Sequence, residues 1–111
     1  MDERAAADLN EVISARLETI RELCREHRVR RLDLFGSGAG RRFNPATSDL
    51  DFVIEFQPMP PAEHADHYFS LLEGIEALLG RPVDLIEAGA IRNPYFRRSV
   101  DETRVTIYAA A

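Results

Sequence analysis

The sequence predicts an α/β fold, with a small mixed β-sheet of three to four strands and helices packed mainly on one face. Three short segments rich in apolar residues, 32–35, 50–56 and 81–87, are typical of strands. Two longer segments, 8–27 and 62–79, carry apolar residues at three- and four-residue spacings, as amphipathic helices do. A chain of 111 residues has room for one domain with a modest core, so we expect residues 1–111 to form a single domain.

Local signals predict where these elements begin and end. Asp8 is the expected N-cap of the first helix, and Gly80 is the expected C-cap of the second, which follows a proline-rich connector at 57–61. The Asn93-Pro94 pair predicts a short helix over residues 95–100, before a final short strand near 105–108. The arginine-rich residues 28–31 are expected to form a solvated turn, with contact to a nucleotide or a partner as the alternative.

Cysteine and histidine residues have ordinary explanations. Cys24 lies on the apolar stripe of the first helix and is expected to be a packed thiol rather than a nucleophile. His64 and His67 lie three residues apart on the second helix, but two histidines without supporting ligands make a weak metal site. We therefore expect both histidines to be exposed.

A pair of carboxylates marks the start of the 50–56 strand. Asp49 and Asp51 share one face because successive side chains of a strand point to opposite faces, and the other face is apolar and should meet helices. Neighbouring carboxylates repel each other, which costs stability. A bound Mg²⁺ removes that cost, since this ion is typically held by one or two carboxylates together with substrate phosphates. The pair therefore indicates a metal site, with a solvent-facing polar edge as the alternative.

A glycine-serine turn precedes this pair. Gly36 and Gly38 let the backbone approach a ligand closely, and Ser37 adds a hydroxyl group. Where such a turn opens a helix, the free N–H groups and the helix dipole favour phosphate. A phosphate cradle one short hairpin away from a metal-binding pair predicts nucleotidyl or phosphoryl transfer from a nucleoside triphosphate.

A third aspartate lies inside the apolar segment 81–87. Asp84 would be expensive to bury without a partner, and the cost is explained if it lies beside Asp49 and Asp51. The alternative is an aspartate on an edge strand that points to solvent.

Together these residues form a recognisable signature. Gly36-Ser37 followed by Ser48-Asp49-Leu50-Asp51 resembles the GS…DxD pattern of the polymerase-β-like nucleotidyltransferases. From about residue 29 to 108 the chain resembles more closely a minimal nucleotidyltransferase (MNT) domain, the antitoxin of HEPN/MNT toxin–antitoxin pairs. The similarity includes Val83-Asp84-Leu85 and the ending Arg92-Asn93-Pro94-Tyr95…Ile107-Tyr108. One departure is that Ala39 is followed by Gly40-Arg41, where the family commonly has arginine before glycine.

The resemblance implies a fold, a reaction and a set of residues. The fold would be the nucleotidyltransferase fold, and the reaction would be transfer of AMP from ATP with two Mg²⁺ ions held by the carboxylates. Asp84 would also act as general base on the acceptor, a hydroxyl of a tyrosine on a cognate HEPN ribonuclease toxin, in a type VII-like antitoxin system. The implied metal and catalytic residues are Asp49, Asp51 and Asp84, and the implied nucleotide-binding residues are Gly36, Ser37, Arg41, Arg42 and Ser48.

Composition limits the alternatives. The formal net charge of −5, from 14 basic and 19 acidic residues, argues against general binding to a nucleic-acid backbone. No apolar run is long enough to span a bilayer, the N-terminus lacks the apolar core of a signal peptide, and a single cysteine suits a reducing cytoplasm. Two other functions stay open: an antitoxin that acts by contact alone, which the exchanged Gly40-Arg41 keeps in view, and a small-molecule nucleotidyltransferase of the aminoglycoside type.

Overall fold

The computed structural model describes residues 9–39, 44–46 and 49–111. Its secondary structure follows the predicted order of helices and strands. The strands are β1 Val29–Phe35, β2 Leu50–Phe56, β3 Val83–Glu87 and β4 Val105–Ala109. The α-helices are α2 Glu11–Ser14, α3 Leu17–Glu26, α4 Pro61–Leu79 and α5 Pro94–Thr103, and two short 3₁₀ helices are η1 Gly36–Ala39 and η2 Ala88–Ala90.

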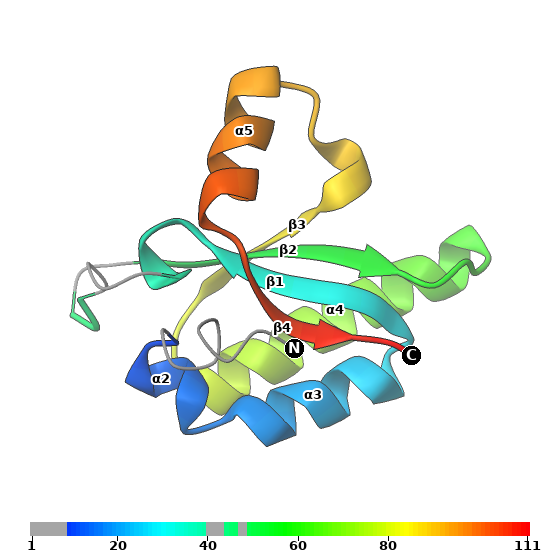
Figure 1. The fold of residues 1–111 in the computed structure, drawn as a ribbon. Helices are drawn as coiled ribbons and strands as arrows, with labels where there is room; N and C mark the ends of the chain where they lie inside the picture. The colour runs from blue at the N-terminus through cyan, green and yellow to red at the C-terminus, as the bar shows by residue number, and fades with distance from the viewer. Residues whose placement is uncertain (1–8, 40–43, 47–48) are drawn as a thin grey trace.

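The four strands form one mixed sheet in the order β3-β2-β1-β4, which confirms the predicted α/β class (Figure 1). Strand β1 pairs with β2 and with β4 in antiparallel orientation, whereas β2 and β3 are parallel. Parallel neighbours need a crossover, and α4 provides it between β2 and β3. In Figure 1 helices α2, α3 and α4 lie on one side of the sheet and α5 lies on the other.

The main hydrophobic core lies between the sheet and helices α3 and α4. It takes alternate residues of β2, with Leu50, Phe52 and Ile54 buried against Ile20 of α3 and other apolar residues of the helices. A second, smaller cluster lies on the α5 side of the sheet and consists of Phe35, Val53, Ala88 and Val100. The period of two along β2 therefore sends its odd-numbered side chains, including that of Asp51, to the face on which α5 and η2 pack.

Three local predictions need correction. The segment 8–27 is interrupted by a turn at Ala15 and Arg16, so it forms two helices, and the N-cap is Asn10, whose side chain accepts a hydrogen bond from the N–H of Ile13. Asp8 lies outside the described residues. Strand β1 starts at Val29, so residues 29–31 belong to the sheet rather than to a solvated turn. Among residues 28–31, only Arg28, with a φ of 56°, has the left-handed conformation typical of a turn.

The caps that were predicted at the other helix ends are confirmed. Gly80 closes α4 in the left-handed conformation with φ 67°, and the side chain of Asn93 accepts hydrogen bonds from the N–H groups of Tyr95 and Phe96 at the start of α5. Helix α5 is longer than predicted and continues to Thr103, which brings its last turn to the end of β1. In the described part of the chain, no helix is long and apolar enough to cross a membrane.

Candidate active site

Two of the three predicted site aspartates face each other across the parallel strands. Asp51 of β2 is the register partner of Asp84 of β3, so the two carboxyl groups are neighbours on the same face of the sheet. Both project from the α5 side of the sheet, because their neighbours Leu50, Phe52, Val83 and Leu85 are buried in the main core. Asp49 precedes β2 and is exposed. The structure therefore places Asp84 beside Asp51, and it also leaves Asp84 exposed on the edge strand β3.

The crowding of the carboxyl groups changes the acidity of Asp51. Partial burial, then the closeness of Asp84 through hydrogen bonding and charge, and then the charge of Asp49 raise the pKa of Asp51 to about 6 from its usual 3.8. In the absence of a cation, protonation of Asp51 relieves the repulsion. A divalent cation would do the same and would displace that proton, so the donor chemistry fits Mg²⁺.

The carboxylates do not form a complete metal cage by themselves. In the ranges that the structure describes, no group of three His, Cys, Asp or Glu side chains is arranged to hold a metal ion. An incomplete set of protein ligands agrees with the usual coordination of Mg²⁺, which keeps several waters and takes substrate phosphates as ligands in addition to one or two carboxylates. The Asp51–Asp84 pair would therefore be the protein's main contribution, with Asp49 close enough to influence it electrostatically.

The raised pKa predicts how stability varies with pH in the metal-free protein. Because the folded state holds its proton more tightly than the unfolded state, this stabilisation is complete below pH 3.8 and is lost as the pH rises through about 6. We expect Asp51→Asn to raise the Tm at pH 7.5 by about 3 °C, a value discounted because Asp51 is only partly buried and solvent screens its interactions.

Thermal unfolding of the two proteins between pH 3.5 and 8 measures this difference. It should disappear at the acid end, and Mg²⁺ should reduce it at pH 7.5 by stabilising the wild type alone. The variant Glu55→Gln, which removes a carboxylate from the same strand away from the pair, is the control. A difference in Tm that is the same at every pH would contradict the assignment of a raised pKa to Asp51.

The glycine turn η1 lies directly beside Asp51. A Cβ atom built on Gly36 would lie 3.4 Å from the Oδ2 atom of Asp51, and the φ of 71° favours glycine at this position. At Gly38 an added Cβ would lie 3.0 Å from a methyl group of Leu50 and 3.6 Å from the carbonyl oxygen of Asp49. Both glycines thus allow the turn to pack closely against the start of β2.

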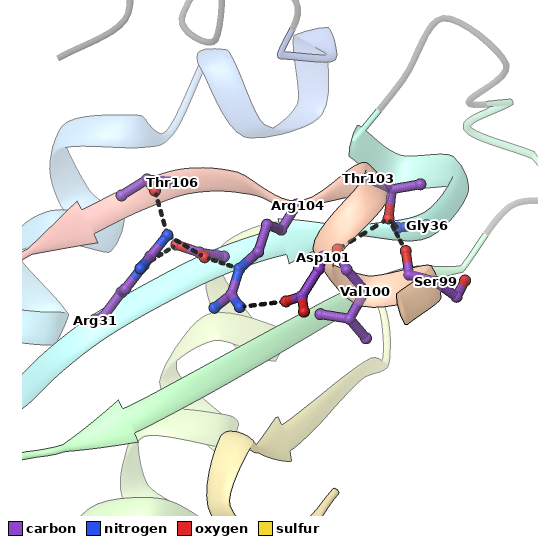
Figure 2. Close-up of polar contacts among 9 residues, drawn as sticks. Arg31, Gly36, Ser99, Val100, Asp101, Thr103, Arg104 and Thr106 are labelled. Atoms are coloured by element: carbon purple, nitrogen blue, oxygen red, sulfur yellow. Dashed lines mark hydrogen bonds and ion pairs between the residues drawn. The ribbon is translucent and has the colours of Figure 1, made fainter. Parts of the chain in front are cut away.

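Side chains from distant parts of the chain hold both ends of the turn. The N–H of Gly36 donates to Oγ1 of Thr103 over 2.9 Å, as Figure 2 shows, and the Nδ2 of Asn10 donates to the carbonyl oxygen of Gly38 over 2.7 Å. The turn therefore touches the last turn of α5 at one end and the N-terminus of α2 at the other. Ser37, between the glycines, is exposed.

The predicted nucleotide-binding residues are only partly placed. Gly36 lies in η1 against Asp51, and Ser37 is the next residue of the same 3₁₀ helix. Arg41, Arg42 and Ser48 lie outside the described residues, and so does the exchanged Gly40-Arg41 pair. Their roles stay predictions.

Sequence reasoning missed a buried charge next to the site. Asp33, in the middle of β1, is fully buried and lies on the same face of the sheet as Phe35. Arg31 and Arg104 both form ion pairs with it, and Arg104 also pairs with Asp101 over 3.0 Å (Figure 2). The available signal was an aspartate between two leucines in a predicted strand, the same signal that singled out Asp84.

The histidines are less exposed than predicted. His64 pairs with Glu87 at the end of β3, and His67 contacts His27 of the neighbouring helix, with 3.1 Å between their Nδ1 atoms. His64 and Glu87 also line two pockets of about 440 and 470 Å³, which are lined by other residues than the aspartates of the site. Cys24 is fully buried, and burial raises the pKa of its thiol to about 12, which confirms a packed rather than a nucleophilic cysteine.

Comparison with known proteins agrees with this geometry. A family model described as "Nucleotidyltransferase domain" matches residues 17–107. A protein of Methanocaldococcus jannaschii named "Putative protein adenylyltransferase MJ1379" is 33% identical over 99 residues, which cover 82% of this chain and 97% of the relative.

Two solved structures have a fold similar to that of this chain. The "Structure of putative minimal nucleotidyltransferase" aligns with 31% identity and a TM-score of 0.63 over 86% of this chain and 92% of the other. A chain in a complex of a tri-AMPylated Shewanella oneidensis HEPN toxin with an MNT antitoxin has the same fold, with a TM-score of 0.58 and 16% identity over 86% and 71% of the two chains.

A sheet that carries paired carboxylates beside a glycine turn is the framework of an enzyme that transfers nucleotides. The chain belongs to the nucleotidyltransferase domain family, and its similarity to minimal nucleotidyltransferases confirms the resemblance seen in the sequence.

Proposed function

We propose that this protein transfers AMP from ATP to a hydroxyl group of a cognate HEPN ribonuclease toxin, with tyrosine as the acceptor, and thereby acts as an antitoxin in the cytoplasm. The observation that carries the proposal is the Asp51–Asp84 pair with Gly36 against it. The names of similar proteins support the choice of reaction and partner, since one is called a protein adenylyltransferase and another structure pairs an MNT antitoxin with an AMPylated HEPN toxin.

The proposed step is a displacement at the α-phosphorus of ATP. The acceptor oxygen forms a bond to the α-phosphorus, the bond from that phosphorus to the oxygen bridging to the β-phosphate breaks, and pyrophosphate leaves. Asp84 removes the proton of the acceptor hydroxyl, for which a carboxylate in this crowded site is suited. Asp49, Asp51 and Asp84 would hold the Mg²⁺ ions, which when bound neutralise charge on the triphosphate.

The residues around the carboxylates would position the triphosphate. Ser37 directly follows Gly36, which packs against Asp51, so the Ser37 hydroxyl would contact the departing pyrophosphate. Arg41, Arg42 and Ser48, which lie between η1 and β2 in the sequence, would complete the nucleotide site. The acceptor hydroxyl would come from the partner.

Transfer of label from α-labelled ATP tests the proposal. The protein is incubated with Mg²⁺ and the product of the neighbouring gene, and label on the partner is expected with the wild type and with Glu55→Gln, but not with Asp49→Ala/Asp51→Ala. Label from γ-labelled ATP should not appear, because adenylyl transfer releases that phosphate in pyrophosphate.

Each alternative gives a different result. An unlabelled partner that is still bound and neutralised would leave an antitoxin that acts by contact alone. Label that appears on an aminoglycoside and not on the partner would instead assign a small-molecule nucleotidyltransferase. Label that persists in the double variant would place the chemistry away from the aspartates.

A further inference from the structure

The position of Gly36 needs an explanation beyond its own flexibility. Glycine adopts positive and negative φ angles with similar ease, so its φ of 71° is permitted but is not enforced by the residue itself. A small rotation there would move the whole turn relative to Asp51, whose Oδ2 lies where a Cβ of Gly36 would make contact. Some other group must therefore hold the turn in register with the carboxylates.

The hydroxyl of Thr103 is placed to do this. It donates its hydrogen to the carbonyl oxygen of Ser99 over 2.9 Å, which leaves a lone pair to accept the N–H of Gly36, also over 2.9 Å (Figure 2). A threonine hydroxyl has one hydrogen only, so the bond to Ser99 fixes its orientation. The acceptor is thus directed at the turn before any ligand arrives.

Thr103 is itself firmly supported. The next residue, Arg104, is tied to the buried Asp33, and Val100 on the preceding turn of α5 is fully buried in the second cluster. Near the other end of the helix, Phe96 packs edge-to-face on Phe35, with 5.9 Å between the ring centroids. Residues before and after Thr103 therefore contact β1, so the residue that accepts the hydrogen bond from Gly36 is held in place from both sides.

We infer that Thr103 is a positioning residue of the nucleotide site, which sets the glycine turn against the Asp51–Asp84 pair through its bond to Gly36. In this role the N–H of Gly36 holds the turn in place, and contact with phosphate falls to the residues that follow it. The inference rests on the proposed function, because it assigns the turn to triphosphate binding.

Substitution of the hydroxyl alone tests this. Thr103→Val keeps the shape of the side chain, Thr103→Ser keeps the hydroxyl, and Thr106→Val makes the same change three residues away, where the hydroxyl accepts from Arg31 instead of from the turn. Binding of ATP with Mg²⁺, measured by calorimetry on the whole protein, should weaken about fivefold in Thr103→Val, the size expected from one neutral hydrogen bond. Binding by Thr103→Ser and Thr106→Val should stay within about twofold of wild type.

Two further readouts separate positioning from a general structural role. The backbone amide resonance of Gly36 should shift in Thr103→Val and return in Thr103→Ser. With the partner present, the KM for ATP should rise in Thr103→Val more than kcat falls, because the defect lies in holding the triphosphate.

The outcomes are distinguishable. Wild-type protein that does not bind ATP with Mg²⁺ would overturn the proposed function and this inference together. Normal binding by the wild type with equal affinity in Thr103→Val would overturn the inference alone. Equal losses in Thr103→Val and Thr106→Val, or no rescue by serine, would also overturn it, because the effect would then not depend on the Thr103 hydroxyl.

Discussion

Replacing Asp84 by asparagine is expected to lower the rate of adenylyl transfer by about 10²–10⁴-fold, the usual contribution of a positioned general base. Asparagine has nearly the same shape, so the strand pairing that places this residue opposite Asp51 should be kept. It cannot accept the proton of the acceptor hydroxyl. The loss should therefore appear in kcat. The KM for ATP should change by no more than about threefold, because the substitution removes the proton acceptor and not a contact that binds ATP.

Single-turnover rates at saturating ATP are the appropriate measurement, with Glu55→Gln as the control for loss of a carboxylate on the neighbouring strand. Asp51→Asn and Asp84→Asn should both raise the Mg²⁺ concentration needed for half-maximal rate, because both residues are proposed metal ligands. At saturating Mg²⁺ the rate of Asp84→Asn should stay low, because this variant also lacks the proposed base. A rate for Asp84→Asn within threefold of wild type would remove Asp84 from the role of base.

Replacing Arg104 by methionine is expected to reduce the free energy of unfolding by about 3–5 kcal/mol, the cost of breaking a buried ion pair by removing one partner. The carboxylate of Asp33 has no solvent exposure, and after the substitution only Arg31, whose side chain is 42% exposed, would remain to compensate it. Arg104 also joins the end of α5 to β1, so its loss removes the support of Thr103.

Denaturant unfolding of a double-mutant cycle measures this. Asp33→Val/Arg104→Met should be more stable than Arg104→Met alone, because the apolar pair leaves no buried carboxylate to compensate, while Arg31 keeps access to solvent with a side chain that is 42% exposed. Asp101→Asn is the matched control: it removes the other ion pair of Arg104, but the Asp101 side chain is 51% exposed, so the cost should stay below about 1 kcal/mol. A loss in Arg104→Met as small as that in Asp101→Asn would show that the buried pair contributes little.

The candidate site was predictable to the extent that its residues are close in sequence. Asp49 and Asp51 were predicted to share a face because a strand has a period of two, but β2 begins at Leu50, so only Asp51 belongs to the strand. Gly36 belongs to a turn because glycine tolerates the conformation that the turn requires. Asp84 was predicted to lie beside the pair by a cost argument, and the register of β2 and β3 places it opposite Asp51. That register depends on the crossover through α4, which no local pattern specifies.

Other features could not be found in this way. The burial of Asp33 depends on Arg104, 71 residues later, and the bond from Gly36 to Thr103 spans 67 residues. The break in the first helix was also missed, because the apolar spacing continues through Ala15 and Arg16 while the backbone turns. Asn10 caps α2 and also donates to Gly38, a contact across 28 residues that the sequence does not indicate.

The sequence by itself determined the class of fold, the helix caps at Gly80 and Asn93, and the identity of the carboxylates and the glycine turn. Each of these follows from side-chain periodicity or backbone preference over a few neighbouring residues. Only the tertiary structure decided which strands are neighbours, which aspartate is buried, and which side chains hold the turn. Those outcomes depend on the closure of long loops, and their energy comes from contacts between segments that have no local relation to each other.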